Sequence, residues 1–241
     1  QNGLTQIHQH NMGAFGGPNI IADGLVYALD AANSISYSGS GTSATDLTGD
    51  STSTTLINGV GYSSNDLGYF DFDGIDDKIN ITYAAQPATS GMTVIAWVYP
   101  DEDATTGGRT RGSAWGGPGA MYLGLWPNSS AGSSAIHAAV QTASGRPSIQ
   151  TGTIYTNQWS MLAMSYDGSN TKTYVNGELI GTVTQTGNIA SGTTYYVGTY
   201  ANLGDSNHNF PGRISYATMY NRGLTAAEIQ QNYNTIKPRY I

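Results

Sequence analysis

The densest cluster of chemically active side chains in this sequence is acidic. Asp71, Asp73, Asp76 and Asp77 lie close together in the chain. Hard cations such as calcium take several oxygen ligands from such a segment, but the spacing does not follow the EF-hand loop because Gly74 is misplaced. We favour a tight turn held by hydrogen bonds to the Asp73 side chain. Calcium at Asp73, Asp76 and Asp77 is the alternative that stays open, and no other cofactor is expected.

Paired carboxylates for glycoside hydrolysis are not evident. A retaining glycosidase needs two carboxyl groups about 5 Å apart, and an inverting one needs a spacing of about 6.5–9.5 Å. The chain has only three Glu residues, Glu102, Glu178 and Glu228. Only Glu102 has close acidic neighbours, Asp101 and Asp103, and these lie in an expected loop. The sequence therefore predicts no catalytic residues and no enzymatic activity.

Composition excludes several further classes of function. The net charge is −7, with no basic cluster beyond Arg109 and Arg111, so nucleic acid is not an expected partner. The chain has no Cys, which removes disulfides and thiol chemistry. No apolar run reaches the length of a membrane span. No Gly-x-Ser-x-Gly segment stands between a strand and a helix, as a nucleophilic serine would require.

Aromatic residues near loops are the remaining candidates for a binding site. Sugars present apolar C–H faces to aromatic rings, and polar side chains can bind the hydroxyl groups. Trp97 and Trp159 fall inside expected core strands, where packing is their simplest role. The candidate ligand-binding residues are Trp115, Trp126, Tyr200, Asn202, Asp205 and Asn207. They would form a glycan site or an interface anchor, and the sequence does not choose between them.

The elements that must position these residues are short strands. Alternating or continuous apolar runs separated by turn residues indicate a β-sandwich. The central strand is residues 92–99, which should be buried on both faces. Asn176-Gly177 predicts a type I′ hairpin. The expected strands are residues 23–30, 69–72, 78–83, 92–99, 121–126, 135–141, 158–166, 171–175, 178–183, 193–200 and 212–220.

One short helix is expected at the C-terminal end. Thr225 and Glu228 form a capping-box pattern, and Leu224 can pack on Ile229 as a hydrophobic staple. Ile229 and Tyr233 share one face of the helix. A helix this short needs tertiary packing, so it should lie on the sandwich.

Residues 1–22 differ from the rest of the chain and are expected to form an extended N-terminal arm. Their apolar side chains exceed what a solvated tail needs, and a sandwich has sheet edges to which an extended segment can add. We therefore expect an arm that contacts other subunits, followed by one domain over residues 23–241. The apolar arm residues are Leu4, Ile7, Met12, Phe15 and Ile20.

Five segments in order resemble the laminin-G-like domains of the concanavalin A-like lectin/glucanase superfamily. The resemblance covers residues 23–236, and it implies an all-β jelly-roll sandwich of two antiparallel sheets with ligand sites on the concave face or the strand-end loops. Related domains bind calcium at a sheet edge, but the corresponding loop here, residues 112–120, contains no acid. The segments are FDFDGIDDKI (70–79), MTVIAWVYP (92–100), QWSMLAMSYDGSNTKTYVNGELIGT (158–182), YYVGTY (195–200) and FPGRISYATMYNRGLTAAEIQQNYN (210–234).

Residues 17–49 also resemble the opening of laminin-G-like structural proteins of tailed phages. This resemblance implies a non-enzymatic virion protein, either structural or adhesive, such as a capsid decoration, fibre or tail-associated protein. Its expected partners are other virion subunits, copies of itself and a host-surface glycan, and its expected location is the virion surface. The alternative is a carbohydrate-binding lectin domain of a secreted or cell-surface protein, located outside the cell.

Overall fold

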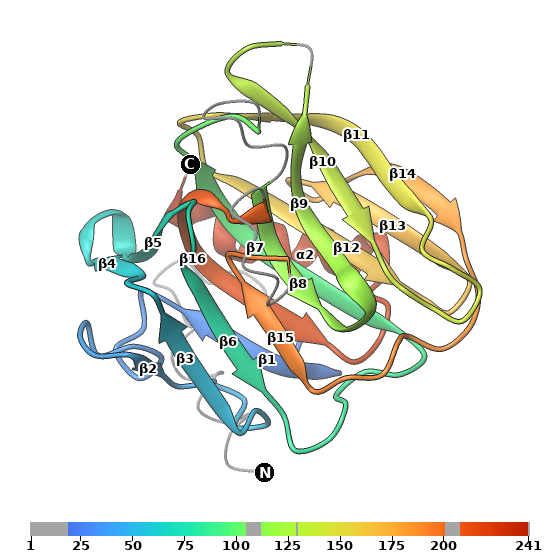
Figure 1. Cartoon of the computed structure of the whole chain (residues 1–241), viewed down its shortest axis with the longest axis horizontal. Helices are drawn as coiled ribbons and strands as arrows, with labels where there is room; N and C mark the ends of the chain where they lie inside the picture. The colour runs from blue at the N-terminus through green and yellow to red at the C-terminus, as the bar shows by residue number, and fades with distance from the viewer. Residues whose placement is uncertain (1–18, 105–111, 129, 201–207, 241) are drawn as a thin grey trace.

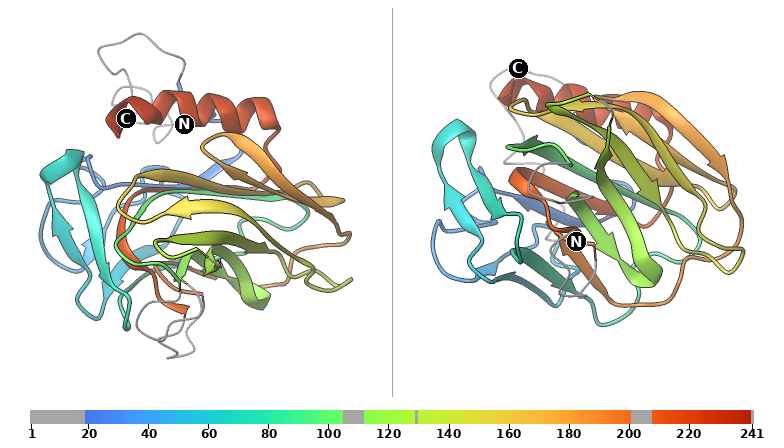
Figure 2. Two further views of the ribbon diagram at one scale, coloured as in Figure 1. Left: turned by 90° about the horizontal axis from the view of Figure 1, so that it is seen from above. Right: turned by 45° about the horizontal axis from the view of Figure 1, so that its top comes forward.

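Two antiparallel β-sheets pack face to face, and a single α-helix of the described part covers the outer side of one of them (Figures 1 and 2). The structure is a computed structural model that describes residues 19–104, 112–128, 130–200 and 208–240. The predicted class, an all-β sandwich with a short C-terminal helix, is confirmed and is consistent with a concanavalin A-like jelly roll.

The first sheet is built around the long strand β16 (Pro211–Tyr220). One edge of β16 pairs with β7 (Met92–Pro100), and the other edge pairs with β5 (Tyr69–Asp73) at its start and with β1 (Leu25–Asp30) at its end. The remaining strands continue the sheet on both sides. In spatial order the sheet contains β14 (Glu178–Thr184), β13 (Asn170–Val175), β12 (Ser160–Tyr166), β7 (Met92–Pro100), β16, β5 (Tyr69–Asp73) and β4 (Gly61–Ser63).

The second sheet contains most of the strands that the sequence analysis missed. They are β2 (Ser43–Ala44), β3 (Ser53–Ile57), β8 (Gly112–Gly117) and β11 (Ser148–Tyr155); the fifth missed strand, β4, belongs to the first sheet. β8 was not predicted because its glycines are typical of turns, and β11 was not predicted because most of its residues are polar. In spatial order the sheet contains β11 (Ser148–Tyr155), β10 (Ser133–Ala139), β9 (Met121–Pro127), β8 (Gly112–Gly117), β15 (Thr194–Val197), β6 (Lys78–Thr82), β3 (Ser53–Ile57) and β2 (Ser43–Ala44).

β7 contributes to two hydrophobic cores, because successive side chains of a strand point to opposite faces. Val94, Ala96 and Val98 lie in the core between the sheets. Ile95 and Trp97 lie in a second core between the first sheet and the helix. This confirms the prediction that β7 is central and buried on both faces.

The helix α2 (Ala226–Ile236) begins at the predicted capping box. The Thr225 hydroxyl accepts the Glu228 N–H at 3.3 Å, and the Thr225 N–H donates to Glu228 Oε2 at 2.8 Å. Ile229 and Tyr233 are buried against the first sheet, as their spacing predicts. The described residues also contain the short 3-10 helices η1 (Asn65–Leu67), η3 (Pro118–Ala120) and η5 (Lys237–Arg239).

The β13–β14 hairpin also matches its prediction. Asn176 and Gly177 take φ values of 50° and 84°. A type I′ turn requires positive φ at both central residues, so the Asn-Gly pair satisfies this turn.

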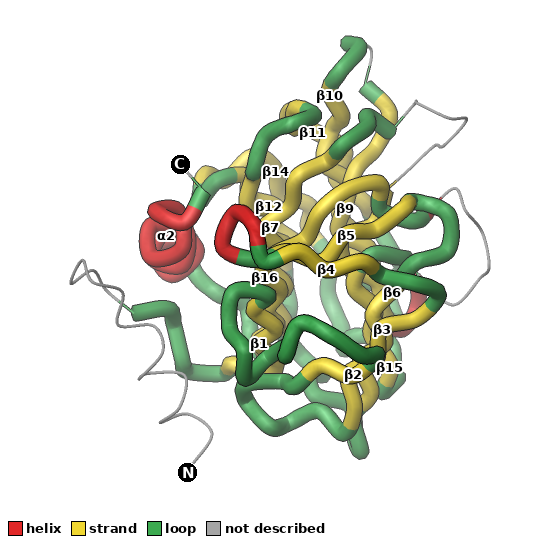
Figure 3. Tube along the Cα trace, turned by 90° about the vertical axis from the view of Figure 1, so that its left-hand side faces the viewer, coloured by secondary structure: helices red, strands yellow, loops and turns green. Residues whose placement is uncertain are grey.

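Residues 19–24, which lie directly before β1, pack on their own domain, and Figure 3 shows this part of the chain beside α2. Ile20 is only 6% exposed and lies in the core beneath the helix. The Ile21 N–H donates to Asn232 Oδ1 at 2.8 Å, and Gln231 Nε2 donates to the Asn19 carbonyl at 2.8 Å. The assignment of Ile20 to an assembly arm is therefore wrong. The other arm residues, Leu4, Ile7, Met12 and Phe15, lie outside the described residues.

Candidate functional site

Strands β9 and β10 present aromatic side chains on the outer face of the second sheet. Leu123 and Leu125 of β9 point into the core between the sheets, so Tyr122 and Trp126 project from the opposite face. His137 of β10 lies directly across from Gly124. A Cβ built on Gly124 would lie 2.2 Å from the Gly112 carbonyl oxygen, so glycine here allows the close approach of β8.

These rings form a continuous row with two residues that come from later in the chain. The ring centroids of Trp126 and His137 are 4.6 Å apart, and those of His137 and Tyr122 are 4.7 Å apart. The ring of Tyr122 meets the ring of Tyr200 edge to face, with their centroids 5.6 Å apart. Tyr200 in turn stacks on His208, with a centroid distance of 5.0 Å and an interplanar angle of 21°. The row joins residues that are far apart in the sequence.

Arg146 adds a cation to this row. Its Nη1 donates to the Tyr200 hydroxyl at 2.8 Å, and its guanidinium carbon lies 5.8 Å from the centre of the Tyr200 ring. Arg146 is exposed, and Trp126 and His208 are half-buried. We call this set the aromatic–histidine face: Trp126, His137, Tyr122, Tyr200, His208 and Arg146.

This face can bind a flat, hydroxylated ligand. Exposed parts of Trp126 and His208 offer ring surface, while Arg146 offers N–H donors in a fixed planar group. Tyr122, His137 and Tyr200 are buried beneath them, so the rings are held in place by packing. A preorganised surface of this kind loses little conformational entropy on binding.

Trp115 does not belong to this face. The indole is completely buried, and its Nε1 donates to the Ile95 carbonyl at 3.0 Å between the two sheets. Its ring meets Tyr27 edge to face at 5.9 Å. The prediction that Trp115 binds a ligand is therefore wrong, because a fully buried indole offers no surface. Trp97 is also completely buried, as predicted, and Trp159 is half-buried against the helix-side core.

The glycine next to Trp115 explains why this strand resembled a loop in sequence. A Cβ built on Gly116 would lie 2.0 Å from the Tyr200 carbonyl oxygen. Only glycine therefore allows the Tyr200 backbone to cross β8 this closely. The glycines mark a close approach of two chain segments, and this approach places Tyr200 beside β9.

Of the predicted ligand-binding residues, the structure brings Trp126 and Tyr200 together through Tyr122 and His137. Asn202, Asp205 and Asn207 lie outside the described residues. Sequence reasoning missed Tyr122, His137 and Arg146 as site residues. A signal did exist for two of them: Tyr122 and His137 occupy positions opposite to the apolar residues of their strands.

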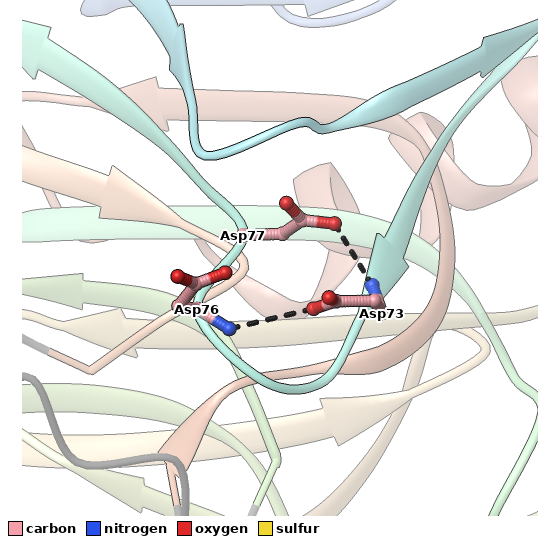
Figure 4. A group of neighbouring side chains, drawn as sticks. All are labelled: Asp73, Asp76 and Asp77. Atoms are coloured by element: carbon pink, nitrogen blue, oxygen red, sulfur yellow. Dashed lines mark hydrogen bonds between the residues drawn. The ribbon is translucent and has the colours of Figure 1, made fainter.

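The acidic cluster forms the predicted tight turn between β5 and β6 (Figure 4). Asp73 Oδ1 accepts the N–H groups of Ile75 at 2.7 Å and Asp76 at 3.4 Å. Asp77 Oδ2 accepts the Asp73 N–H at 3.0 Å. Asp73, Asp76 and Asp77 each offer a carboxylate oxygen within 4.8 Å of the others. The hydrogen bonds therefore form the predicted turn, and the same turn places three carboxylate oxygens close together.

Asp77 has an unusual environment for a carboxyl group. The residue is only 4% exposed, and its Oδ1 atom is buried without a hydrogen-bond partner. Burial raises the pKa of Asp77, the Asp73 N–H lowers it, and the neighbouring carboxylates of Asp73, Asp76 and Asp71 also raise it, so that the pKa is about 6. The ionised form is therefore poorly stabilised by the protein alone.

A cleft of about 350 Å³ opens beside this turn. Asp73 and Asp77 line one side of it, and Asp101 and Glu102, which follow β7, line another. A second acidic segment therefore lines the same cleft as the turn. That segment is not residues 112–120 but the one at the end of β7.

The fold is that of a lectin-like sandwich domain. The chain belongs to the concanavalin A-like lectin/glucanases superfamily, whose family model matches residues 73–230. No curated protein sequence matches the chain significantly. Within the part of the chain that the structure describes, no helix has the length and apolar character needed to cross a membrane.

Solved structures with the same fold are distant in sequence. Domain 4 of AbnA, a GH43 extracellular arabinanase from Geobacillus stearothermophilus solved with arabinotriose, is 18% identical with a TM-score of 0.62, over 87% of this chain and 98% of that domain. The binding domain of botulinum neurotoxin DC in complex with SialylT is 12% identical with a TM-score of 0.65, over 90% of this chain and 52% of that chain. Trypanosoma rangeli sialidase in complex with sialic acid is 15% identical with a TM-score of 0.69, over 98% of this chain and 38% of that chain. The chain thus spans nearly all of the first structure and about half or less of the other two.

Proposed function

We propose that this chain is a non-enzymatic, glycan-binding adhesive domain and that the aromatic–histidine face is its binding site. The observation that carries the proposal is the row from Trp126 to His208, with Arg146 beside it. The titles of the similar structures name arabinotriose, SialylT and sialic acid as bound molecules, which supports a saccharide as the ligand class.

Binding to a glycan array, followed by titration calorimetry with the best saccharide, tests this proposal. Trp126→Ala should weaken binding about tenfold, because a ring contact contributes about 1 kcal/mol beyond its buried area. Arg146→Ala should weaken it similarly through the lost donors. Trp159→Ala is the matched control, since Trp159 is also half-buried but packs against the helix-side core. Unchanged affinity in both Trp126→Ala and Arg146→Ala would refute the site.

The proposal that the domain is non-enzymatic has its own test. The six residues of the face include no carboxylate, so they offer no pair for glycoside hydrolysis. Incubation with arabino-oligosaccharides and sialylated oligosaccharides should release no sugar. Product release that Glu178→Gln or Glu102→Gln abolishes would make the chain an enzyme.

We further propose that this module is displayed on a virion surface, where it binds a host glycan and contacts other virion subunits. The resemblance of residues 17–49 to tailed-phage structural proteins supports this context. A secreted or cell-surface lectin domain is the alternative, and the similarity to binding domains of toxins supports it equally. Antibodies against the domain should label intact particles; labelling of cells without particles would favour the alternative.

A further inference from the structure

We propose that a groove at the tip of the β13–β14 hairpin binds an extended peptide segment of another protein, one that carries a basic and an acidic side chain. The groove has a volume of about 460 Å³, and its walls are β11, the hairpin and α2, with Lys237 at the end of the helix. A volume of this size is usual for ligand sites. The groove shares no residue with the aromatic–histidine face, so it does not rest on the proposed function.

The groove lies where both sheets end. Among the described strands, β14 is an edge of the first sheet and β11 an edge of the second, and each pairs with a single neighbour. Figure 1 shows these two edge strands side by side. A Cβ built on Gly152 of β11 would lie 2.7 Å from Cδ1 of Ile180 on β14, so glycine allows the two edges to approach closely. Edge strands have backbone N–H and C=O groups to which an extended segment can add.

Two side chains of opposite charge line the groove without an ion-pair partner. Glu178, the first residue of β14, is exposed, and Lys237 is half-buried. Within the part of the chain that the structure describes, neither forms an ion pair with the other or with a third group. Lys237 Nζ lies over the Tyr233 ring, 5.3 Å from its centre. A ligand with a basic group beside Glu178 and an acidic group beside Lys237 would complement both charges.

Side-chain amides in the groove supply the groups that a peptide backbone needs. Gln230 Nε2 donates to Asn234 Oδ1 at 3.2 Å, which leaves Gln230 Oε1 as an acceptor and Asn234 Nδ2 as a donor. A peptide unit offers one N–H and one C=O, so it matches this pair. Asn176 adds a further Nδ2 donor and is held in place by Met161 of β12: its Oδ1 accepts the Met161 N–H at 2.8 Å, and its own N–H donates to the Met161 carbonyl at 2.9 Å.

The same groove offers little to a sugar, which packs its apolar face on an exposed aromatic ring. Tyr233 is the one aromatic residue among the described lining residues, and it is only 8% exposed. Its ring stacks on Trp97 and has the Lys237 ammonium over it. The groove therefore combines amides and two opposite charges without a ring surface, which favours a peptide over a second glycan.

Selection of a phage-displayed library of random octapeptides on the immobilised full chain tests the proposal. We expect enriched sequences that carry one basic and one acidic residue. The best peptide, made synthetically with a fluorescent label, is then titrated with the full chain by fluorescence anisotropy. Glu178→Gln and Lys237→Met should each weaken binding about threefold to fivefold, the effect of losing an exposed ion pair. Met keeps the apolar stem of Lys237, so the helix end should stay folded.

Charge reversal gives a sharper readout than charge removal. Selection on the Glu178→Lys variant should replace the enriched basic residue by an acidic one. Asp66→Asn and Lys172→Met are the matched controls, because they remove an exposed carboxylate and a half-buried ammonium outside the groove lining. Both controls should keep the affinity of the wild-type chain for the peptide.

Saccharide binding, measured on the same samples, separates this proposal from the proposed function. Saccharide binding without any enriched peptide would refute the groove alone, and peptide binding without saccharide binding would refute the aromatic–histidine face alone. The groove proposal is also overturned if the selected peptide binds Glu178→Gln and Lys237→Met with unchanged affinity, or if the best saccharide displaces the peptide.

Discussion

The indole of Trp97 stacks on the ring of Tyr233 with their centroids 5.7 Å apart and their planes at 7°. Trp97 belongs to the central strand β7 and Tyr233 to α2, so this contact joins the helix to the middle of the first sheet. The ring of Tyr240 stacks on the same indole at 4.5 Å. The helix is thus held by aromatic packing in addition to its capping box.

Removing the Tyr233 ring should detach the helix from the sheet. We expect Tyr233→Ala to lower the free energy of unfolding by about 3 kcal/mol, the cost of deleting a large ring from a core. Tyr233→Leu should cost less because it retains apolar volume. Urea denaturation measures both variants. Equal costs for the two would contradict the stacking contact as the source of the stability.

The hairpin turn gives a second prediction about stability. Gly177→Val should lower the free energy of unfolding by about 1–2 kcal/mol, because a β-branched residue resists the positive φ of 84°. Gly177→Asn is the control, since Asn accepts this conformation. Glu228→Ala, which breaks the capping box, should cost about 1 kcal/mol and rank below Gly177→Val. Thermal melts that reverse this ranking would count against the turn assignment or the cap.

The ion pair at the start of α2 predicts a dependence on pH. The Arg222 guanidinium, with further hydrogen bonds from Thr225, lowers the pKa of Glu228 from 4.5 to about 2. Arg222 Nη2 lies 2.6 Å from Glu228 Oε1. A lowered pKa in the folded state stabilises the protein above the unfolded value, and this stability is lost as the pH falls from about 4.5 to 2.

Comparison with Glu228→Gln isolates this contribution from that of other carboxylates. The wild-type protein should be about 0.5 kcal/mol more stable than Glu228→Gln at neutral pH, because Gln keeps an acceptor for the capping box and loses only the charge. This difference should disappear near pH 2. Glu178→Gln, at an exposed position on β14, should show no such convergence. Urea denaturation at a series of pH values measures the difference, and a constant gap would speak against the pair.

Truncation tests the N-terminal arm. Deleting residues 1–18 should leave a folded domain, because Asn19, Ile20 and Ile21 still hold their contacts to α2. Deleting residues 1–22 should cost about 2 kcal/mol or more, since it also removes the buried Ile20. Thermal melts compare the two truncations.

We also expect the chain without residues 1–18 to lose assembly with other subunits or copies of itself. Light scattering of the full and truncated chains measures this. If the shorter chain assembles as the full chain does, the arm has no role in assembly.

Local patterns in the sequence were sufficient for the elements whose signals are local. The Asn176-Gly177 turn, the Thr225–Glu228 capping box and the alternation of β7 depend on neighbours within a few residues. These interactions are the same in the peptide and in the fold, so the all-β class, the hairpin and the helix could be predicted. The Asp73 turn was predicted for the same reason.

Tertiary structure alone decided which distant residues meet. Trp115 is buried because β8 lies between β9 and β15, a pairing that its glycines do not reveal. Tyr122, His137 and Tyr200 share one face because long-range strand pairing brings them together, and Asp101 and Asp77 line the same cleft for the same reason. Strand order is set by packing and hydrogen bonding summed over the whole chain, and no single segment carries that information.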